Sequence, residues 1–526
     1  MATDFTKLKP LLDTPEWEVL GNIFIAAGTA ATAGAGACLI DDKRLSSLTK
    51  APNLWFLNSA TQLLQYNNRT NGWLQLSSPA LAGTFGTGAG GVFAPSQGPR
   101  GTIAAGATTT SFTLSAVLPN SATVQANQLK GLTVRVIGNN AAGSGKTEER
   151  IILGNTAGTT PTINLESALS FTPGTGAAYE LLAGRAFLMS AGTLAANIFK
   201  YFDVATTVYN TSAIATTNMP ATIGTDSVLL SLDELHTPIT GYNGAVINGE
   251  TGGYFGSLTA TASGATSITG QAASGDATVA ANEFRNFQIR IIEDTATPTA
   301  VGQRRRITSH TAGASPVYTV PAWTVTPSAT AKYYIENNND IIMWASANTN
   351  TYRFDPVALA WDTTTYATRP VADATGLCAW HPFNRAYDSN KRVNWGTIFA
   401  PRGGNTNIID MLDITAATTG TWTADIAYDN KGLTLFNTGG CATYEPVSNK
   451  TMIRPLGVAN IGSQVYSFDN DTISLRSYYQ VPFLNSTAVN GEKLATGLFF
   501  DGTDKKGFVY IVPDSQSVML RSLVFV

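Results

Sequence analysis

Large apolar and aromatic residues occur along this chain in short runs, which are separated by turns rich in Gly, Asn, Asp and Pro. In 132–136, written Leu-Thr-Val-Arg-Val, apolar and polar positions alternate, which is typical of a strand with one face in water. Thr, Val, Ile and aromatic residues favour strands. The pattern therefore predicts an all-β protein with many strands and many turns.

A short motif recurs within this pattern: an aromatic residue, then Asp or Asn, and a second large residue seven positions after the first. Asp caps a turn through its own backbone, and Pro fixes φ where it follows. We therefore expect the chain to return after each Asp, so that the two large residues pair across a hairpin. The clear copies are Tyr66-Asn67 to Trp73, Phe202-Asp203 to Tyr209, Phe354-Asp355-Pro356 to Trp361, and Phe468-Asp469 to Leu475.

Each motif lies within a longer unit, with an apolar strand before it and another after a following proline. Weaker units follow from Ile408 to Trp422, from Val465 to Leu475 and from Phe508 to Met519. This order predicts five or six four-stranded units, the last completed by N-terminal strands near Trp17 to Ile25. In the three clear units the post-proline strands are Gly90 to Phe93, Val228 to Leu230, and Gly376 to Trp380.

The unit that contains Phe354-Asp355-Pro356 and Trp361, with a proline and a Gly-led apolar strand after it, resembles the blades of kelch-type β-propellers. The Gly-Gly doublet of such blades is present at Gly90-Gly91, and the other copies depart from it. The resemblance implies a kelch-like β-propeller of about five to six blades, whose radial stacking covers both faces of each sheet. The alternative is another array of β-sandwiches or barrels.

A longer segment of roughly eighty residues occurs twice, at 101–182 and again at 256–336. The duplication, together with the strand-like alternation in 132–136 of the first copy, predicts two homologous inserted β-domains, each a small β-barrel or sandwich of five to seven strands. The alignment matches Ala126–Ile137 with Ala281–Ile292, Glu149–Ile152 with Arg305–Thr308, Thr156–Gly158 with Thr311–Gly313, Pro173 with Pro327, and Tyr179 with Tyr334.

The two repeats together predict an order of domains. We expect an N-terminal segment and the first blade in 1–100, inserted β-domain 1 in 101–182, and a blade in 183–255. Inserted β-domain 2 is expected in 256–336 and the remaining blades in 337–526.

Composition narrows the class of protein further. The 526 residues carry a net charge of −3 with only 13% charged residues, so no basic face for nucleic acid or anionic membrane is expected. Arg304-Arg305-Arg306 is the one basic run; it fits a solvated strand face better than a contact with DNA phosphates or an acidic partner.

Localisation follows from the N-terminus, the apolar runs and the cysteines. The first residues lack the pattern of a signal peptide, and no apolar stretch approaches the roughly 18 residues that span a bilayer. We therefore expect a soluble chain without a membrane span, made in a cytoplasm. Cys38, Cys378 and Cys441 are too few and too far apart for a disulfide scaffold or a metal site, and are expected to be buried small residues.

Asn140 to Thr147, written Asn-Ala-Ala-Gly-Ser-Gly-Lys-Thr, is close to a phosphate-binding loop. Such a loop needs Gly where this chain has Asn140, and it opens a helix, whereas 148–152 continues as a strand. We therefore expect a flexible hairpin tip here and no phosphate site.

Catalytic residues are not evident either. His236, His310 and His381 share no motif or metal spacing and are expected to be structural. Acidic residues could in principle serve a glycosidase, but Asp203, Asp355 and Asp469 occupy the repeated turn position, and Asp469-Asn470-Asp471 lacks the other ligands of a calcium loop. We expect no enzyme, no catalytic residue, no cofactor and no metal. The remaining acidic residues weighed are Asp41-Asp42, Asp233-Glu234, Asp410 and Asp413.

One further resemblance concerns the second long copy, over roughly forty residues. Its residues resemble segments that recur in structural proteins of tailed bacteriophages, and the Gly/Ala/Thr/Asn-rich, His-poor composition of the whole chain is similar to theirs. The matching residues are Gly302-Gln303, Arg304, Arg306-Ile307, Ser309, Thr311, Trp323, Pro327–Thr330 and Tyr333–Ile335.

Short-tailed phages close the tail with a nozzle or hub ring, often built from β-propeller subunits with inserted β-domains, and this chain resembles that class. The resemblance implies a virion subunit of the tail or neck, in a homo-oligomeric ring of about six copies that guides DNA outward. Its expected partners are the portal or adaptor, tail fibres and, non-specifically, genomic DNA in the channel. It implies synthesis in the cytoplasm of a bacterial host.

Two alternatives remain open. The chain could be a receptor- or glycan-binding fibre or decoration protein, using exposed aromatic residues such as Tyr254-Phe255 and Trp323. It could also be a polysaccharide-cleaving enzyme on a propeller scaffold. Oligomeric state separates the first two classes, because fibres are usually trimers.

Overall fold

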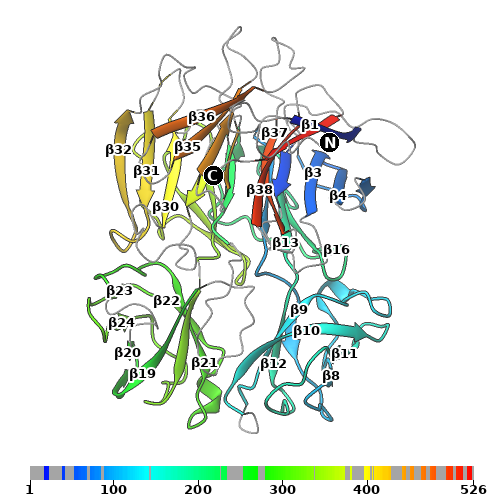
Figure 1. Cartoon of the computed structure of the whole chain (residues 1–526), viewed down its shortest axis with the longest axis vertical. Coiled ribbons are helices and arrows are strands. Elements are labelled where there is room, and N and C mark those ends of the chain that lie inside the picture. The colour runs from blue at the N-terminus through cyan, green and yellow to red at the C-terminus, as the bar shows by residue number, and fades with distance from the viewer. Residues whose placement is uncertain are drawn as a thin grey trace, which may run out of the picture.

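The fold is all-β and consists of many antiparallel sheets (Figure 1). The computed structural model describes residues 17–22, 38–41, 53–67, 72–83, 88–140, 144–224, 227–233, 253–270, 279–336, 338–372, 379–381, 396–402, 406, 408–427, 441–445, 450–454, 464–469, 474–480, 493–500, 505–512 and 518–523.

Six of the sheets in the described residues have four strands each and are called ring sheets 1 to 6. Ring sheet 1 is β2 (Cys38–Asp41), β3 (Asn53–Ser59), β4 (Gln62–Asn67) and β5 (Gly72–Gln75); ring sheet 2 is β6 (Gly90–Ala94), β13 (Arg185–Met189), β15 (Phe199–Asp203) and β16 (Val208–Tyr209); ring sheet 3 is β18 (Val228–Ser231), β26 (Ile341–Trp344), β27 (Tyr352–Asp355) and β28 (Ala360–Asp362). Ring sheet 4 is β29 (Ala379–His381), β30 (Thr397–Pro401), β31 (Ile408–Asp413) and β32 (Thr421–Ala427); ring sheet 5 is β33 (Cys441–Glu445), β34 (Lys450–Arg454), β35 (Gln464–Asp469) and β36 (Ser474–Gln480); ring sheet 6 is β37 (Lys493–Phe500), β38 (Lys505–Val512), β39 (Val518–Leu523) and β1 (Trp17–Asn22).

The ring sheets form a closed, propeller-like cycle. The first strands contact one another in the order β2, β6, β18, β29, β33 and β37, and β37 contacts β2 again. The N-terminal strand β1 pairs with the C-terminal strand β39, with Trp17 opposite Ser522. This confirms that N-terminal residues complete the last unit, and it joins the two ends of the chain in one sheet.

The recurring motif forms the hairpin between the third and fourth strands of its sheet. Its two large residues face each other in all four copies: Tyr66 opposite Trp73, Phe202 opposite Tyr209, Phe354 opposite Trp361, and Phe468 opposite Leu475. The expected cross-strand pairs are confirmed.

The aspartates of the motif cap the turns, as expected. Asp203 Oδ1 accepts hydrogen bonds from the amides of Ala205 and Thr206 at 3.1 and 3.3 Å. Asp355 Oδ1 accepts from the amides of Val357 and Ala358 at 2.9 and 3.0 Å. The side chain of Asp469 lies outside the described residues.

The grouping of the strands differs from the sequence expectation by one position. The strand after each proline does not complete its own unit but begins the next sheet, so that β6 pairs with β13 and β18 pairs with β26. Gly91 suits this place because a Cβ there would collide with Ile40 of the neighbouring strand β2. The strand expected at 376–380 begins ring sheet 4 as β29, and residues 376–378 lie outside the described residues.

Both long segments are therefore inserted between the first and second strands of a ring sheet. Barrel 1, between β6 and β13, has the strand order β7, β12, β9, β10, β11, β8. A bridge between Ile103 and Leu114 joins β7 to β8 and closes it. Its elements are β7 (Arg100–Thr102), β8 (Ser111–Thr113), the 3₁₀ turn η1 (Pro119–Ser121), β9 (Thr133–Ile137), β10 (Thr147–Asn155), β11 (Thr162–Leu165) and β12 (Ala178–Leu182).

Barrel 2, between β18 and β26, has the order β22, β21, β25, β19, β20, β24, β23. The terminal members β22 and β23 belong to the same stretch of chain, 304–310, and this closes the barrel. Its elements are β19 (Gly253–Gly264), β20 (Ser267–Gly270), β21 (Gln288–Glu293), the 3₁₀ turn η2 (Pro298–Ala300), β22 (Arg304–Arg306), β23 (Ser309–His310), β24 (Val317–Thr319) and β25 (Lys332–Glu336). A small sheet of β14 (Gly192–Thr193) and β17 (Thr222–Ile223) lies in the ring part of the sequence.

Equivalent hydrogen bonds identify which residues of the two barrels correspond. Arg150 Nε donates to the carbonyl of Ala168 at 3.0 Å, and Arg305 Nε donates to that of Ala322 at 2.9 Å. Arg150 therefore corresponds to Arg305, and the sequence alignment, which matches it with Arg306, is wrong by one residue here.

A second shift of one residue occurs near the end of the barrels. Tyr179 lies opposite Val136 in barrel 1, whereas Tyr333 lies opposite Ile291 in barrel 2. Tyr179 thus corresponds to Tyr333 and not to Tyr334. Neither shift is visible in the sequence because neighbouring residues are similar in type.

The two barrels join the ring differently. The apolar core of barrel 2, with Phe284, Ile289 and Tyr333, continues without interruption into Trp344 of ring sheet 3 and Leu412 of ring sheet 4. Barrel 1 has a core of its own, which the ring meets through Ala205 and, at its margin, Val208. Figure 1 shows both barrels side by side below the ring sheets.

Candidate functional site at the seam between the barrels

The largest group of buried charges in the described residues lies where the barrels meet, here called the seam. Arg135 of β9 is 2% exposed and contacts three carboxylates. Its guanidinium lies 2.8 Å from Glu149 and 2.9 Å from Glu180, both in barrel 1, and 3.4 Å from Glu336 in barrel 2. Burial alone would lower the pKa of Arg135, but the charges of these three glutamates outweigh burial and raise it.

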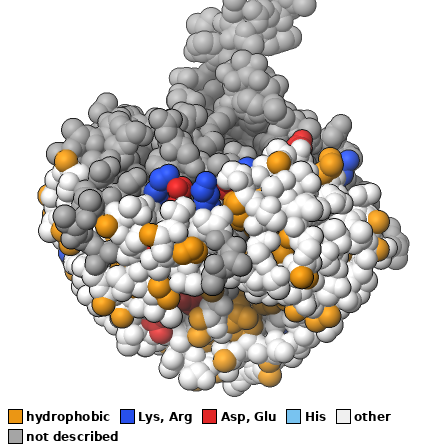
Figure 2. Space-filling view, turned by 90° about the horizontal axis from the view of Figure 1, so that it is seen from below, with side chains coloured by type: hydrophobic (Ala, Val, Ile, Leu, Met, Phe, Trp, Pro, Cys, Tyr) orange, Lys and Arg blue, Asp and Glu red, His pale blue; other side chains and the backbone are white. Residues whose placement is uncertain are grey.

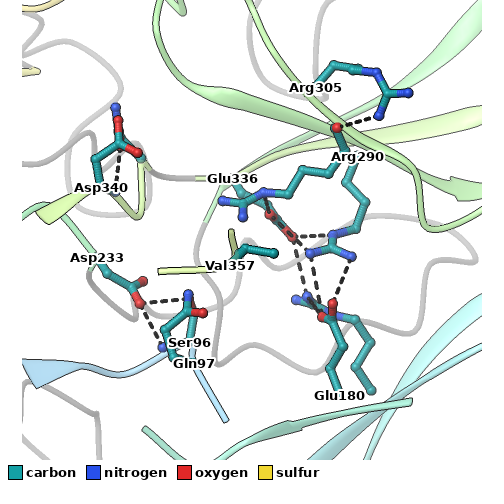
Figure 3. A network of polar contacts seen from close by, with 12 residues as sticks. Ser96, Gln97, Glu180, Asp233, Arg290, Arg305, Glu336, Asp340 and Val357 are labelled. Carbon is teal, nitrogen blue, oxygen red and sulfur yellow. Dashed lines mark hydrogen bonds and ion pairs between the residues drawn. The ribbon is translucent and has the colours of Figure 1, made fainter. Parts of the chain in front are cut away.

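Arg290 occupies the corresponding position on β21 and contacts two of the same carboxylates, Glu336 and Glu180 (Figure 3). Its Nε donates to Glu336 Oε1 at 2.6 Å, and its Nη2 lies 3.5 Å from Glu180 of barrel 1. Arg135 and Arg290 therefore each reach a glutamate of the opposite barrel. Arg304 adds an ion pair with Glu336 at 2.8 Å, and Arg100 adds one with Glu180 at 3.4 Å.

The seam keeps its carboxylates ionised. Burial would raise the pKa of Glu336, but the charges of Arg290, Arg304 and Arg135 outweigh burial and lower it to about 2. Burial likewise opposes ionisation of Glu180, and Arg290, Arg100 and Arg135 lower its pKa. These groups are fixed charges near neutral pH, which suits a structural junction and not proton transfer.

Backbone and apolar contacts accompany the charges at the seam. The amide of Asp294 in barrel 2 donates to the carbonyl of Gly145 in barrel 1 at 2.6 Å. Ile137 of barrel 1 belongs to the core of barrel 2 and lies against Gly302, where a Cβ would be 2.7 Å from its Cγ2 atom. The seam thus combines complementary charge with a close fit.

Asp233 links the two segments that leave the ring toward the barrels. It follows β18, is 4% exposed, and accepts hydrogen bonds from the amide and hydroxyl of Ser96, which follows β6, at 3.1 and 2.7 Å (Figure 3). Burial raises the pKa of Asp233 to about 6, although the bonds from Ser96 and the charge of Arg304 act in the opposite direction.

A second buried charge group attaches barrel 2 to the ring. Asp340 precedes β26 and lies 2.7 Å from Arg353 of β27 and 3.2 Å from Arg306 of barrel 2. It also accepts a hydrogen bond from the hydroxyl of Tyr366 at 2.8 Å. Burial opposes ionisation, but the charges of Arg353 and Arg306 lower the pKa of Asp340.

The basic run does not form the expected solvated strand face, so that prediction is wrong. Arg304 pairs with Glu336 and Arg306 with Asp340, while the guanidinium of Arg305 lies 5.4 Å from the ring centre of Trp323. All three arginines are half-buried. The described surface seen from the barrel side carries few charged side chains among many apolar and uncharged ones (Figure 2).

His310 is structural, as expected, and its role has a counterpart in barrel 1. Its Nε2 accepts the amide hydrogen of Phe284 at 2.8 Å, while Nδ1 lies 3.0 Å from the carbonyl of Thr311. Burial is the main reason that the pKa of His310 is lowered to about 4. The charge of Arg285 lowers the pKa slightly further, whereas the hydrogen bond to the carbonyl of Thr311 acts in the opposite direction. These contacts describe a neutral imidazole with the proton on Nδ1.

Asn155 does the same in barrel 1, where its Oδ1 accepts the amide hydrogen of Leu129 at 2.8 Å. The alignment of 156–158 with 311–313 already matches Asn155 with His310, so the sequence contained this signal. His236 and the side chain of His381 lie outside the described residues.

The segment that is close to a phosphate loop leads into a strand, as expected. β10 begins at Thr147, and Lys146 forms a bridge with Glu293 of barrel 2. Its tip contacts the neighbouring barrel at Gly145, while 141–143 lie outside the described residues.

The other acidic residues form structural pairs where their side chains are described. Asp203 pairs with Arg185 at 3.1 Å, and Asp410 pairs with Arg402 at 2.6 Å. Asp413 Oδ1 accepts from the amide of Thr415 at 2.8 Å. Asp42, Glu234, Asn470, Asp471 and the side chain of Asp41 lie outside the described residues. Within the described part of the chain, no three His, Cys, Asp or Glu residues are grouped as metal ligands.

Two expectations about exposed or buried side chains are changed. Trp323 is only 6% exposed, so it is not an exposed aromatic residue for ligand recognition. Cys38 is half-buried at the margin of the apolar cluster around Ile40 and Trp55, and not fully buried. The side chains of Tyr254, Phe255 and Cys441, and all of Cys378, lie outside the described residues.

Comparisons with known proteins give no family for this chain. No family model matches it, and no curated protein does. A chain of the mitotic checkpoint complex is similar with a TM-score of 0.29 and 10% identity, over 98% of this chain and 97% of that chain. An auxiliary nutrient binding protein from Bacteroides thetaiotaomicron has a TM-score of 0.22 and 11% identity, over 81% and 83%. Likenesses with such low TM-scores carry no information about function.

The described residues contain no helix that is long and apolar enough to cross a membrane.

Proposed function

We propose that this chain is a kelch-like, six-bladed β-propeller with two homologous inserted barrels, and that it is a structural subunit of a tailed-phage virion. Its place is the nozzle, hub or neck ring of the tail. There it forms part of the DNA ejection channel and a platform for other tail proteins.

The observation that carries this proposal is the joining of a closed cycle of six sheets to two docked barrels through buried structural charge. The described histidine and most described acidic candidates serve turns, ion pairs or backbone amides. A scaffold that uses polar groups in this way supports a structural role better than an enzymatic one. We expect the subunit to assemble as a homo-oligomeric ring of about six copies.

The proposed partners follow from that place in the particle. They are other copies of this chain, the portal or adaptor, and tail fibres, with non-specific contacts to genomic DNA in the channel. The fibre or decoration alternative loses one of its supports, because Trp323 is covered by Arg305 and not exposed.

The position in the virion can be tested with antibodies raised against barrel 1. Gold-labelled antibodies on particles of a phage that encodes this chain should mark the tail end or neck. Label along fibres or on the capsid surface would favour the alternative, and absence of the chain from purified particles would reject both. Release of sugar from capsular or cell-wall glycan by the purified protein would favour an enzyme instead.

A further inference from the structure

The two barrels are homologous but are held to the ring by different forces. Barrel 2 shares a continuous apolar core with ring sheets 3 and 4. Polar contacts reinforce this junction: Asn286 Nδ2 donates to the carbonyls of Ile414 and Ala417, and Arg306 pairs with Asp340. Moving barrel 2 would expose a large apolar area to water, which is strongly unfavourable.

Barrel 1 meets the ring through Ala205 and Val208 at the edge of its core and through polar contacts near ring sheet 2. Gln128 Nε2 donates to the carbonyl of Ala205 at 2.9 Å, and Asn120 Nδ2 donates to the hydroxyl of Tyr201 at 3.2 Å. The amide of Thr211 donates to Asn120 Oδ1 at 3.2 Å. Water can replace each of these bonds, so little free energy is lost when they open.

The covalent connection of barrel 1 is a pair of short segments, 95–99 and 183–184, which run together between the ring and the barrel. Gly184 has φ +87° and its amide donates to the carbonyl of Gln97 at 2.7 Å. Gly98 lies so close to the carbonyl of Leu181 that a Cβ would collide with it. Element-terminal positions of this kind are where hinges absorb changes in φ and ψ.

The remaining attachment of barrel 1 is the seam, which is mostly charged. Its cross-barrel pairs are Arg135 with Glu336 and Arg290 with Glu180. Ile137 and, at the margin, Ala178 of barrel 1 pack against the apolar core of barrel 2. Separated arginine and glutamate side chains regain hydration, which offsets much of the lost attraction. A charged seam therefore opens at lower cost than an apolar seam of the same area.

We propose that barrel 1 is a movable arm that undocks from barrel 2 at the seam and pivots on 95–99 and 183–184, while barrel 2 stays fixed to the ring. The contacts at the seam hold barrel 1 in its docked position. Such an arm does not depend on where the chain lies in a virion.

Hydrogen exchange in the full-length protein tests directly whether the two barrels separate at the seam. The amide of Asp294 is bonded across the seam, whereas that of Ile291 is bonded to Gln303 within barrel 2. An undocking arm predicts that Asp294 exchanges at least about tenfold faster than Ile291. It also predicts that exchange at Asp294 accelerates between low and high salt, while Ile291 stays unchanged.

Glu180→Gln removes the charge that Arg290 of barrel 2 contacts across the seam, and Glu166→Gln makes the same chemical change at an exposed position of barrel 1. The first substitution should accelerate exchange at Asp294 by about tenfold or more, and the second should not. If Glu180→Gln does not fold, the salt series on the unaltered protein still decides. Equal exchange at Asp294 and Ile291 under all salt conditions would overturn the proposal, because the barrels would then open only together.

Discussion

Arg135 of barrel 1 and Glu336 of barrel 2 lie 3.4 Å apart, so that the two copies of a duplicated segment share one buried charge group. The reciprocal contact runs from Arg290 to Glu180. The duplication thus supplies two equivalent arginines, and their partners differ because β12 and β25 carry their glutamates at different positions.

Removing Arg135 should destabilise barrel 1 strongly. Arg135→Met leaves Glu149, whose side chain is fully buried, without this arginine, and the expected loss in free energy of unfolding is about 3–5 kcal/mol. Urea unfolding followed by tryptophan fluorescence measures it.

The double variant Arg135→Met with Glu149→Leu is the matched control. It removes both charges, and we expect it to recover a large part of the loss. A double variant no more stable than Arg135→Met alone would contradict a loss caused by the buried carboxylate of Glu149.

His310 should be replaceable by the residue that barrel 1 uses at the same place. His310→Asn keeps an acceptor for the amide of Phe284, so we expect a cost below about 1 kcal/mol. His310→Ala leaves that buried amide without an acceptor and should cost about 1–3 kcal/mol. Equal losses in chemical unfolding would show that the hydrogen bond is not the reason for His310.

The same residue predicts a dependence of stability on pH. Because the folded pKa of His310 is lowered from 6.5 to about 4, its contribution is complete above pH 6.5 and declines as pH falls toward 4. The loss over this window is on the order of 3 kcal/mol. His310→Asn should therefore flatten the decline between pH 6.5 and 4, and an unchanged profile would speak against a neutral buried imidazole.

Asp233 predicts the opposite slope. Its folded pKa is raised from 3.8 to about 6, so its contribution is complete below pH 3.8 and is lost as pH rises through 6. Asp233→Asn keeps the oxygen that accepts both bonds from Ser96, and Gln97 and Arg304 are the other groups that face it. Unfolding at pH 7.5 should show equal or greater stability, by up to roughly 3 kcal/mol. A loss above about 1 kcal/mol would mean that the charge itself is needed.

Trp361 holds two ring sheets together as well as closing its own hairpin. Its ring centre lies 5.0 Å from that of Phe354 in ring sheet 3 and 5.1 Å from that of Phe199 in ring sheet 2. Trp361→Ala should cost about 3–5 kcal/mol in thermal or urea unfolding. Val357→Ala, at a 48% exposed position of the same hairpin, should stay within about 0.5 kcal/mol, and similar losses for both would contradict this role.

The hairpins are predictable from sequence because everything that defines them is local. Phe354, the turn at Asp355 and Trp361 lie in one short stretch, so their spacing contains the register. The pairing of β6 with β13 is different, since Gly91 meets Leu188 only after the whole of barrel 1. The residues next to such a strand in the sequence do not indicate whether it ends one sheet or begins the next.

The seam is not predictable from the sequence for a related reason. Its ion pairs join separate repeats, and a pair such as Arg135 with Glu336 leaves no periodic signal. Arg304 to Arg306 resemble a solvated run because consecutive cations are usually exposed. Here Glu336 and Asp340, which lie more than thirty residues further along the chain, form ion pairs with Arg304 and Arg306.

The mass of the purified protein in solution, with images of the particles it forms, tests the proposed structural role most directly. The proposal predicts a closed ring of about six copies, with a central opening wide enough for a DNA duplex. A compact trimer without such an opening would contradict the proposed ring and would favour the fibre or decoration class instead.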